Sequence, residues 1–259
     1  RASGETKANF MLLGFYVYPI MLPMFYPQFA RIGNDSLCIL IVGLLFYFLA
    51  KLNTHNFFSK DAIATGLLLG LGLLTKAFFL PISAAIYFFF ILNIFKSSLP
   101  LSKRSLIKYV LLVITISISI GSIWYLYNYY SYNSISGANI THQLQYCNVI
   151  GSIAKNFSVI TFLRATGATF VTFVWGGTWS LAHINYWLYI PMLAFLGLIV
   201  YFYFLLLHFR PLDSFLWIPV FLLLFFELGL LWHIFINIAL GSSGSPNTPG
   251  WYLHILLPF

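Results

Sequence analysis

Two charged residues, Asp35 and Lys76, stand at the ends of long apolar runs. Asp35 comes directly before the run that begins at Ser36, and Lys76 interrupts the run GLLLGLGLLTKAFFLP. A polar break at residues 51–61 separates the two runs. If that break lies at one face of a membrane, the two runs carry Asp35 and Lys76 to the opposite face. A carboxylate and an ammonium at one membrane face would suit an enzyme that acts on a charged lipid.

Both residues also have simpler interpretations. An aspartate before an apolar run most often caps a helix, and a capping Asp35 could still hold a cation or a sugar hydroxyl. Lys76 either snorkels to the membrane surface or meets an anion. The small residues Gly66 and Gly70, with Gly72 nearby, would let another helix approach closely and enclose the ammonium. This neighbourhood favours a phosphate partner for Lys76.

Two further charged residues, Arg164 and Glu227, lie within apolar sequence. The guanidinium of Arg164 could take a phosphate bidentately, although contact with lipid headgroups is commoner for an interfacial arginine. Glu227 is expected to have a hydrogen-bonding partner in a helical bundle and a structural role. The histidines lack ligand spacing, and Cys38 and Cys147 lie in different settings, so no metal site is predicted.

Composition places these residues in a membrane protein. Of 259 residues, 61% are hydrophobic and 7% are charged, whereas soluble domains carry about 25% charged residues. The formal net charge of +8 indicates basic loops that orient a membrane protein, and nothing in the sequence indicates nucleic-acid binding. The expected partner is the lipid bilayer. A multi-pass protein of a bacterial or archaeal plasma membrane is expected, or of the endoplasmic reticulum if the source is eukaryotic.

The apolar runs predict an all-α, polytopic transmembrane bundle of about 7 to 8 spans. Residues 1–259 are expected to form this single bundle without a soluble domain. Residues 62–95 are too many for one span, so two helices should meet near residues 76–81. The predicted spans are 8–26, 36–50, two within 62–95, 105–126, 187–207 and 215–235.

The charges in the predicted loops set the orientation of the bundle. If the N-terminal stub, 51–61, 96–108 and 208–213 lie inside, nine lysines and arginines gather there, three lie outside, and Lys76 lies at the membrane edge. The positive-inside rule favours this distribution. Asp35 and Lys76 then both lie at the extracytoplasmic face.

The stretch 127–186 is predicted to be an extracytoplasmic loop. Within it, residues 157–175 are apolar enough for a helix, but Arg164, Gly167 and the pair 176–177 interrupt them. We interpret 157–175 as a re-entrant or interfacial segment, since a true span would invert everything after it. Both chain ends are expected to be cut, because the first residue is not Met and the last apolar run is too short for a span.

Five segments together carry a family resemblance: PQFARIGNDSL, GLLLGLGLLTKAFFLP, GSIWYLYNYYSYNSISG, FVWGGTWS and TPGWYLHILLPF. With them the chain resembles a bacterial family of polytopic membrane proteins that is grouped with the GT-C glycosyltransferases. It is more distantly similar to protein O-mannosyltransferases and to lipid A aminoarabinose transferases. The resemblance covers nearly the whole chain and implies a GT-C-like bundle.

The resemblance assigns roles to individual residues. Asn34 and Asp35 match the N-D at the outer start of a span, and Lys76 ends the match to L-T-K. The family's usual catalytic acid would lie ahead of Arg1, outside this chain. Arg164 matches no quoted motif and enters only as a second cation for phosphate.

Two further matches lack the arginine of the family pattern. Asn128 matches the end of W-Y-x-R-N, and Tyr252 matches the end of G-R-Y. Tyr127 and Trp251 stand where the family usually has arginine. The replacements weaken phosphate binding at these two positions and leave open a different donor or a degenerate member.

The resemblance implies sugar transfer from a polyprenyl-phosphate donor to an acceptor of unknown identity on the extracytoplasmic face. Lys76 and Arg164 would stabilise the phosphate, and Asp35 would orient the acceptor or assist a metal ion. No cofactor is certain, and a divalent cation stays open. The alternative is a multi-pass transporter or flippase that uses Lys76 and Glu227, and a silent scaffold is a third. The predicted site comprises Asp35 as catalytic residue and Asn34, Lys76, Asn128, Arg164 and Tyr252 as substrate- or phosphate-binding residues.

Overall fold

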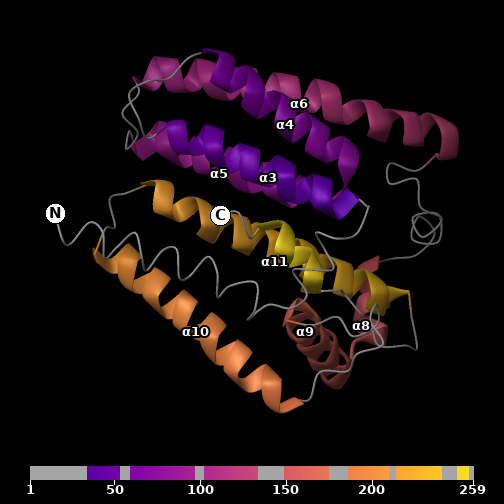
Figure 1. The fold of residues 1–259 in the computed structure, drawn as a ribbon. Coiled ribbons are helices and arrows are strands. Elements are labelled where there is room, and N and C mark those ends of the chain that lie inside the picture. The colour runs from indigo at the N-terminus through magenta and orange to yellow at the C-terminus, as the bar shows by residue number, and fades with distance from the viewer. Residues whose placement is uncertain are drawn as a thin grey trace, which may run out of the picture.

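The structure of the protein is a computed structural model, which describes seven ranges of the chain. Within the described ranges it consists of α-helices and two 3-10 helices, without a strand. The predicted all-α bundle is therefore confirmed (Figure 1). The described residues are 34–52, 59–96, 102–133, 149–174, 186–209, 214–240 and 250–256.

The first two described helices form an antiparallel hairpin. Helix α3 spans Asn34–Lys51 and helix α4 spans Ser59–Thr75. Lys51 at the end of α3 pairs with Asp61 at the start of α4, and Asp35 at the start of α3 pairs with Lys76 just after α4. The two helices therefore lie side by side along their whole length, as the polar break at 51–61 predicted.

The chain reverses between α4 and helix α5 (Phe79–Lys96) within three residues. The backbone N–H of Lys76 donates to the carbonyl of Gly72 at 3.0 Å, and that of Phe79 donates to the carbonyl of Lys76 at 3.1 Å. A Cβ on Gly72 would lie 2.1 Å from the ring of Phe79, so only glycine permits this tight turn. Two helices meet where the length of 62–95 predicted.

Helix α6 (Lys103–Tyr132) packs along α4 and runs parallel to it. A Cβ on Gly66 would lie 2.9 Å from Ile116 Cβ, and one on Gly70 would lie 2.7 Å from Ile120 Cβ. Small residues thus let the two backbones approach closely, which confirms the expected helix contact. The 30 residues of α6 extend over about 45 Å, so its last turns project beyond the Lys76 end of α4 (Figure 1).

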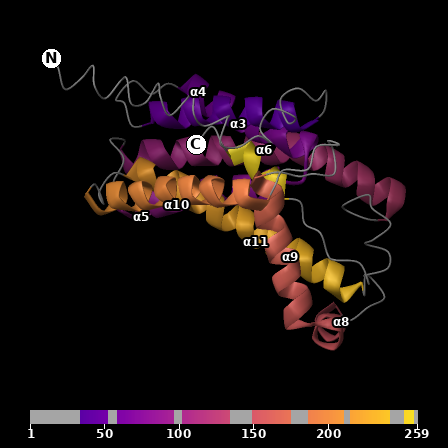
Figure 2. The same ribbon diagram turned by 60° about the horizontal axis from the view of Figure 1, so that its bottom comes forward.

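The second half of the chain packs on the first through α11 and η2. Helix α11 lies against α5 and α8, and η2 lies against α9, α3 and α11. Phe79 and Phe89 of α5 and Phe226 of α11 are among the largest fully buried side chains. Figures 1 and 2 show α10 at the edge of the bundle. The bounds are α8 Val149–Asn156, α9 Val159–Val174, α10 Tyr186–Phe209, η1 Ser214–Leu216, α11 Trp217–Ala239 and η2 Gly250–Leu256.

Five helices in the described ranges are long and apolar enough to cross a membrane, so the protein is an integral membrane protein. They are α3, α5, α6, α10 and α11. At 17 residues, α4 reaches about 25 Å, close to the ~30 Å hydrocarbon core. The span predicted at 8–26 lies outside the described residues. The structure thus shows a polytopic bundle, and the number of spans stays a prediction.

Two expectations for the predicted loop are wrong in their local structure. Residues 127–132 continue α6, and α9 runs unbroken through Arg164 and Gly167. A single glycine costs a helix only about 1 kcal/mol, and a Cβ at Gly167 would meet nothing within 4 Å. Thr169 also folds its hydroxyl back onto the helix by donating to the carbonyl of Ala165 at 3.1 Å. The re-entrant or interfacial role of this segment stays a prediction.

Candidate functional site

Asp35 and Lys76 form an ion pair at one end of the α3–α4 hairpin. Nζ of Lys76 donates to Oδ1 of Asp35, although the two residues are 41 positions apart in the chain. Asp35 is the second residue of α3, inside the helix, so it does not occupy the capping position. Its carboxylate in the first turn suits the positive end of the helix dipole. The expectation that the hairpin brings these two residues together is confirmed.

Two aromatic rings flank the ammonium of Lys76. Nζ lies 4.8 Å from the ring centroid of Tyr252 and 5.1 Å from that of Phe78. The two rings are themselves 4.1 Å apart. Cation–π attraction therefore adds to the ion pair in holding Lys76 in place. The glycine ridge of α4 packs against α6 instead, so the groups around the ammonium come from α3, the α4–α5 turn and η2.

His254 anchors the helix that carries Tyr252. The side chain is 1% exposed, and its Nε2–H donates to the backbone carbonyl of Phe173 in α9 at 2.6 Å. Burial lowers the pKa of His254 to about 4, which keeps the imidazole neutral at pH 7. No role was predicted for His254, because the histidines lack ligand spacing, whereas the structure shows a bond that fixes η2 and thereby Tyr252.

A pocket of about 550 Å³ adjoins the ion pair. It lies between the α4–α5 turn, the first turn of α5, the middle of α11 and η2. Phe78 and Tyr252 line this turn pocket, and they are the same rings that flank Lys76. Apart from His233 and Tyr252 its walls are apolar, and they include Leu80, Pro81, Phe226 and Trp232.

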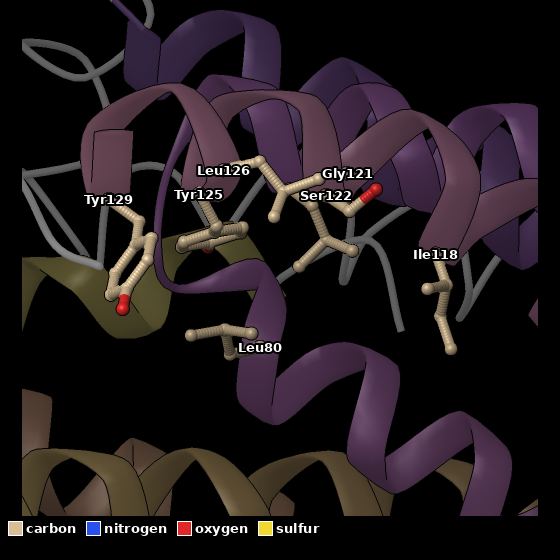
Figure 3. A pocket seen from close by; sticks show the side chains of 8 residues that line it. Leu80, Ile118, Gly121, Ser122, Tyr125, Leu126 and Tyr129 are labelled. Atoms are coloured by element: carbon tan, nitrogen blue, oxygen red, sulfur yellow. The ribbon is translucent and has the colours of Figure 1, made fainter. Parts of the chain in front are cut away.

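A second pocket of about 350 Å³ lies on the other side of Leu80, against α6 (Figure 3). Leu80 lines both pockets and separates this α6 pocket from the turn pocket. Neither pocket was predicted, because apolar wall residues do not stand out in a chain that is 61% hydrophobic. The α6 pocket is lined by Leu73, Leu80, Ile118, Gly121, Ser122, Tyr125, Leu126 and Tyr129.

The remaining predicted site residues lie in three different places. Asn34 is the exposed first residue of α3, next to Asp35. Asn128 of α6 is 1% exposed, and its Nδ2 has no hydrogen-bond partner in the described part of the chain. Arg164 is exposed on α9, and no described contact links it to Asp35. The structure therefore gathers Asp35, Lys76 and Tyr252, and it leaves Asn128 and Arg164 outside that cluster.

Glu227 and His233 of α11 differ in their surroundings. Glu227 is half-buried, and no hydrogen bond or ion pair joins it to another residue within the described ranges. The partner expected for Glu227 is thus not found there. His233, on the wall of the turn pocket, accepts a hydrogen bond at Nδ1 from Nδ2 of Asn237 at 3.1 Å. That bond places the proton of a neutral His233 on Nε2.

The described residues do not build a divalent-cation site. Across these ranges no three His, Cys, Asp or Glu side chains converge on one point. Asp35 is already paired with Lys76, and a site for Mg²⁺ would need further oxygen ligands. The residues at the ion pair therefore do not fit a metal ion, and the chemistry below uses side chains only.

Comparison with protein-family models, curated proteins and solved structures finds no match to this chain. What the fold and the site establish is a class. The protein is a polytopic helical membrane protein with an ion pair, two aromatic rings and an apolar pocket at one end of a helical hairpin.

Proposed function

We propose that the protein is a membrane glycosyltransferase that moves a sugar from a polyprenyl-phosphate donor to an acceptor at the extracytoplasmic face. The observation that carries the proposal is the placement of Lys76 and Asp35 beside the apolar turn pocket, with Tyr252 shared between them. A donor of this kind has a long hydrocarbon chain, an anionic phosphate and a sugar. The site offers one feature for the chain, one for the phosphate and one for the acceptor hydroxyl.

The turn pocket suits the polyprenyl chain. Its volume of about 550 Å³ lies within the ~300–1,000 Å³ typical of ligand sites. Phe226 and Trp232 give it a largely apolar wall, which a hydrocarbon chain covers without leaving polar groups unpaired. A chain that enters along Phe78 and Tyr252 brings its phosphate to the ammonium of Lys76.

Lys76 and Asp35 then divide the chemistry. Transfer breaks the bond between the anomeric carbon and the phosphate oxygen, and the electron pair stays on the phosphate. Lys76 stabilises the negative charge that develops on the departing phosphate. The new bond forms between the acceptor oxygen and the anomeric carbon, and the acceptor proton passes to Asp35 or to a group that Asp35 orients.

The ion pair also orders the events. Without a donor, the carboxylate of Asp35 pairs with the ammonium of Lys76, which is the group that would bind the phosphate. An arriving phosphate competes for Lys76, and the displaced Asp35 becomes free to meet the acceptor hydroxyl. Asn34, exposed beside Asp35, can hydrogen-bond a sugar hydroxyl. Donor binding thus prepares the proton acceptor.

The test is transfer in proteoliposomes that contain the full-length protein and a radiolabelled polyprenyl-phosphate sugar. Lys76→Ala and Asp35→Asn should each lower sugar release and transfer by about 10²-fold or more, the usual contribution of a charge-stabilising or proton-transferring group. Lys76→Arg keeps the cation and controls for folding. Lys51→Ala removes the cation of the other ion pair in the hairpin and should retain activity.

The same vesicles distinguish the alternatives. Movement of the intact labelled lipid across the bilayer, without cleavage of the sugar–phosphate bond, would replace the proposal by a flippase or transporter. In that case the half-buried Glu227 becomes the next residue to substitute. Neither cleavage nor movement would indicate a scaffold.

A further inference from the structure

We propose that a pocket between α4 and α6, at the opposite end of α4 from Lys76, binds the phosphate headgroup of an anionic membrane lipid. The volume of this headgroup pocket is about 230 Å³. It is smaller than the ~300–1,000 Å³ of sites that enclose a small-molecule ligand, so it suits a headgroup and not a whole lipid. The pocket is lined by Ser59 and Ala62 of α4 and by Ser105, Lys108, Tyr109 and Leu112 of α6.

The lining residues follow the order of the parts of a lipid. Along α6 the pocket is lined first by Ser105, then one turn further by Lys108, and after another turn by Leu112. Residues 109–132 contain no charged side chain, so Lys108 lies where the apolar part of this membrane-crossing helix begins. Lipid phosphates lie just outside the hydrocarbon, at that depth. The pocket thus offers a hydroxyl to the headgroup, a cation to the phosphate and an apolar wall to the start of an acyl chain.

The polar side chains of the pocket can bind an anion. No hydrogen bond or ion pair joins Lys108 to another residue within the described ranges. Oγ of Ser105 accepts a hydrogen bond from Oγ of Ser102 at 2.8 Å, which leaves its own hydrogen for a ligand oxygen. The hydroxyl of Tyr109 donates to Thr65 at 2.9 Å, so Tyr109 contributes only a wall. A bond from the Lys108 ammonium to a phosphate oxygen would be charge-assisted and therefore strong.

The charges around the pocket favour an anionic lipid over a zwitterionic one. Asp61 is the acid at this end of α3–α6 in the described ranges; its side chain is 3% exposed, and it already pairs with Lys51 at 3.5 Å. Neither residue lines the pocket. The choline of a zwitterionic lipid would meet an excess of like charge here, whereas a glycerol headgroup adds hydroxyls and no cation. The basic residues at this end are Lys51, Lys60, Lys96, Lys103, Arg104 and Lys108.

The predicted orientation supports a lipid as the source of the phosphate. It places this end of the bundle at the cytoplasmic face, where the leaflet carries anionic lipids and a negative surface potential. A basic pocket between membrane helices at that face is typical of an anionic headgroup site. The inference does not depend on sugar transfer, because it concerns the other end of the α3–α4 hairpin from Asp35 and Lys76.

The experiment uses the full-length protein in phosphatidylcholine nanodiscs that contain a photoactivatable lipid. Two probes carry the same diazirine near the glycerol end of one acyl chain; one is a phosphatidylglycerol and the other a phosphatidylcholine. Cross-linked peptides are mapped by mass spectrometry. The phosphatidylglycerol probe should label residues 105–112 about tenfold more strongly than the phosphatidylcholine probe. Unlabelled phosphatidylglycerol should compete for that labelling, and millimolar glycerol phosphate should not.

Charge-matched substitutions separate the pocket from the basic surface around it. Lys108→Gln should lower labelling by the phosphatidylglycerol probe about tenfold, because it removes the charge-assisted bond to the phosphate. Lys108→Arg keeps the cation and should retain the labelling. Lys96→Gln removes the same charge from an exposed position at the same end, outside the pocket. It should change labelling by about twofold at most, because its field is screened.

Three results would overturn the proposal. Equal labelling by the two probes would show that the pocket does not recognise an anionic lipid. Equal losses in Lys108→Gln and Lys96→Gln would assign the attraction to the basic surface as a whole. Competition by glycerol phosphate would make the ligand a soluble phosphate. The probe comparison uses the unmodified protein, so it decides even where a variant fails to fold, and none of these measurements bears on sugar transfer.

Discussion

The α3–α4 hairpin carries an aspartate–lysine pair at each end, and the two ends differ in what surrounds the pair. Lys51 Nζ lies 3.5 Å from Asp61 Oδ1 and 4.8 Å from the ring centroid of Tyr47. All three residues belong to the hairpin itself. At the other end, Lys76 pairs with Asp35 but takes its second ring, Tyr252, from a helix near the end of the chain.

The surroundings indicate which of the two pairs forms the candidate site. A lysine, an aspartate and an aromatic ring occur at both ends, so residue types alone do not separate them. The Asp61 side chain is nearly buried, at 3% exposed, and its pair closes a loop between consecutive helices. The Asp35–Lys76 pair joins α3 to the α4–α5 turn, receives the ring of Tyr252 from η2, and borders a pocket of about 550 Å³. The contact with η2 and the adjoining pocket distinguish the Asp35–Lys76 end from the Lys51–Asp61 end.

The strongest way to test this contrast is to exchange the charges at each end. Asp35→Lys with Lys76→Asp should recover the thermal stability that either single reversal loses, but transfer should stay about 10²-fold down. The ammonium would then sit on α3, away from Phe78 and Tyr252. The matched exchange of Lys51 and Asp61 should recover stability and transfer together.

Stability and transfer are both measured on the same reconstituted samples. Full recovery of transfer by the exchange at 35 and 76 would show that only the attraction between the two charges matters. Lys76 would then stabilise the fold through its ion pair and have no specific role in transfer.

Acidification should destabilise the folded protein through His254 of η2. Burial lowers the pKa of His254 from 6.5 to about 4, so below pH 6.5 the unfolded chain binds a proton that the folded chain refuses. Stability is therefore complete above pH 6.5 and falls as the pH drops towards 4, by about 2 kcal/mol at pH 5. Thermal unfolding at pH 7 and pH 5 measures this.

His254→Gln provides the control for that titration. Glutamine has no proton to gain in this range and can still donate to the carbonyl of Phe173. The variant should lose most of the difference between pH 7 and pH 5. An unchanged difference would assign the pH dependence to another group.

Asp35→Asn should separate donor binding from turnover. The substitution frees Lys76 from its carboxylate, so an incoming phosphate no longer competes for the ammonium. Binding of a polyprenyl phosphate should become about tenfold tighter, although transfer is lost. Asp61→Asn, at the other end, should leave binding unchanged. Weaker binding in Asp35→Asn would mean that the carboxylate positions the ammonium and does not compete with the phosphate.

Much of this end of the molecule could be predicted from sequence, for a physical reason. Apolar runs separated by polar breaks constrain a chain in a bilayer to hairpins, and this constraint alone brought Asp35 and Lys76 together. The family resemblance predicted Tyr252 as a site residue, but only the structure shows that the face of its ring contacts the ammonium of Lys76. The charge pattern contained no sign that η2 would return to α3.

The two pockets and the continuity of α9 could not be predicted from the sequence, because both depend on how helices pack in space. The two pockets depend on how α5 meets α6 and α11, and Leu80 between them is one apolar residue among many. Helix α9 was expected to break at Arg164 and Gly167, yet local propensities of about 1 kcal/mol yield to packing against η2. The lone Glu227 still has no partner within the described ranges.

A small effect is expected from the tyrosine rings that contact the two lysines, Tyr252 beside Lys76 and Tyr47 beside Lys51. Tyr252→Leu should remove a cation–π contact worth about 0.5–1 kcal/mol and weaken donor binding several-fold. Tyr252→Phe keeps the ring face and should bind the donor almost normally. Tyr47→Leu removes the corresponding ring beside Lys51 and should not alter donor binding at all. Equal losses in the leucine and phenylalanine variants would transfer the role from the ring of Tyr252 to its hydroxyl, which is the group a phosphate would then have to meet.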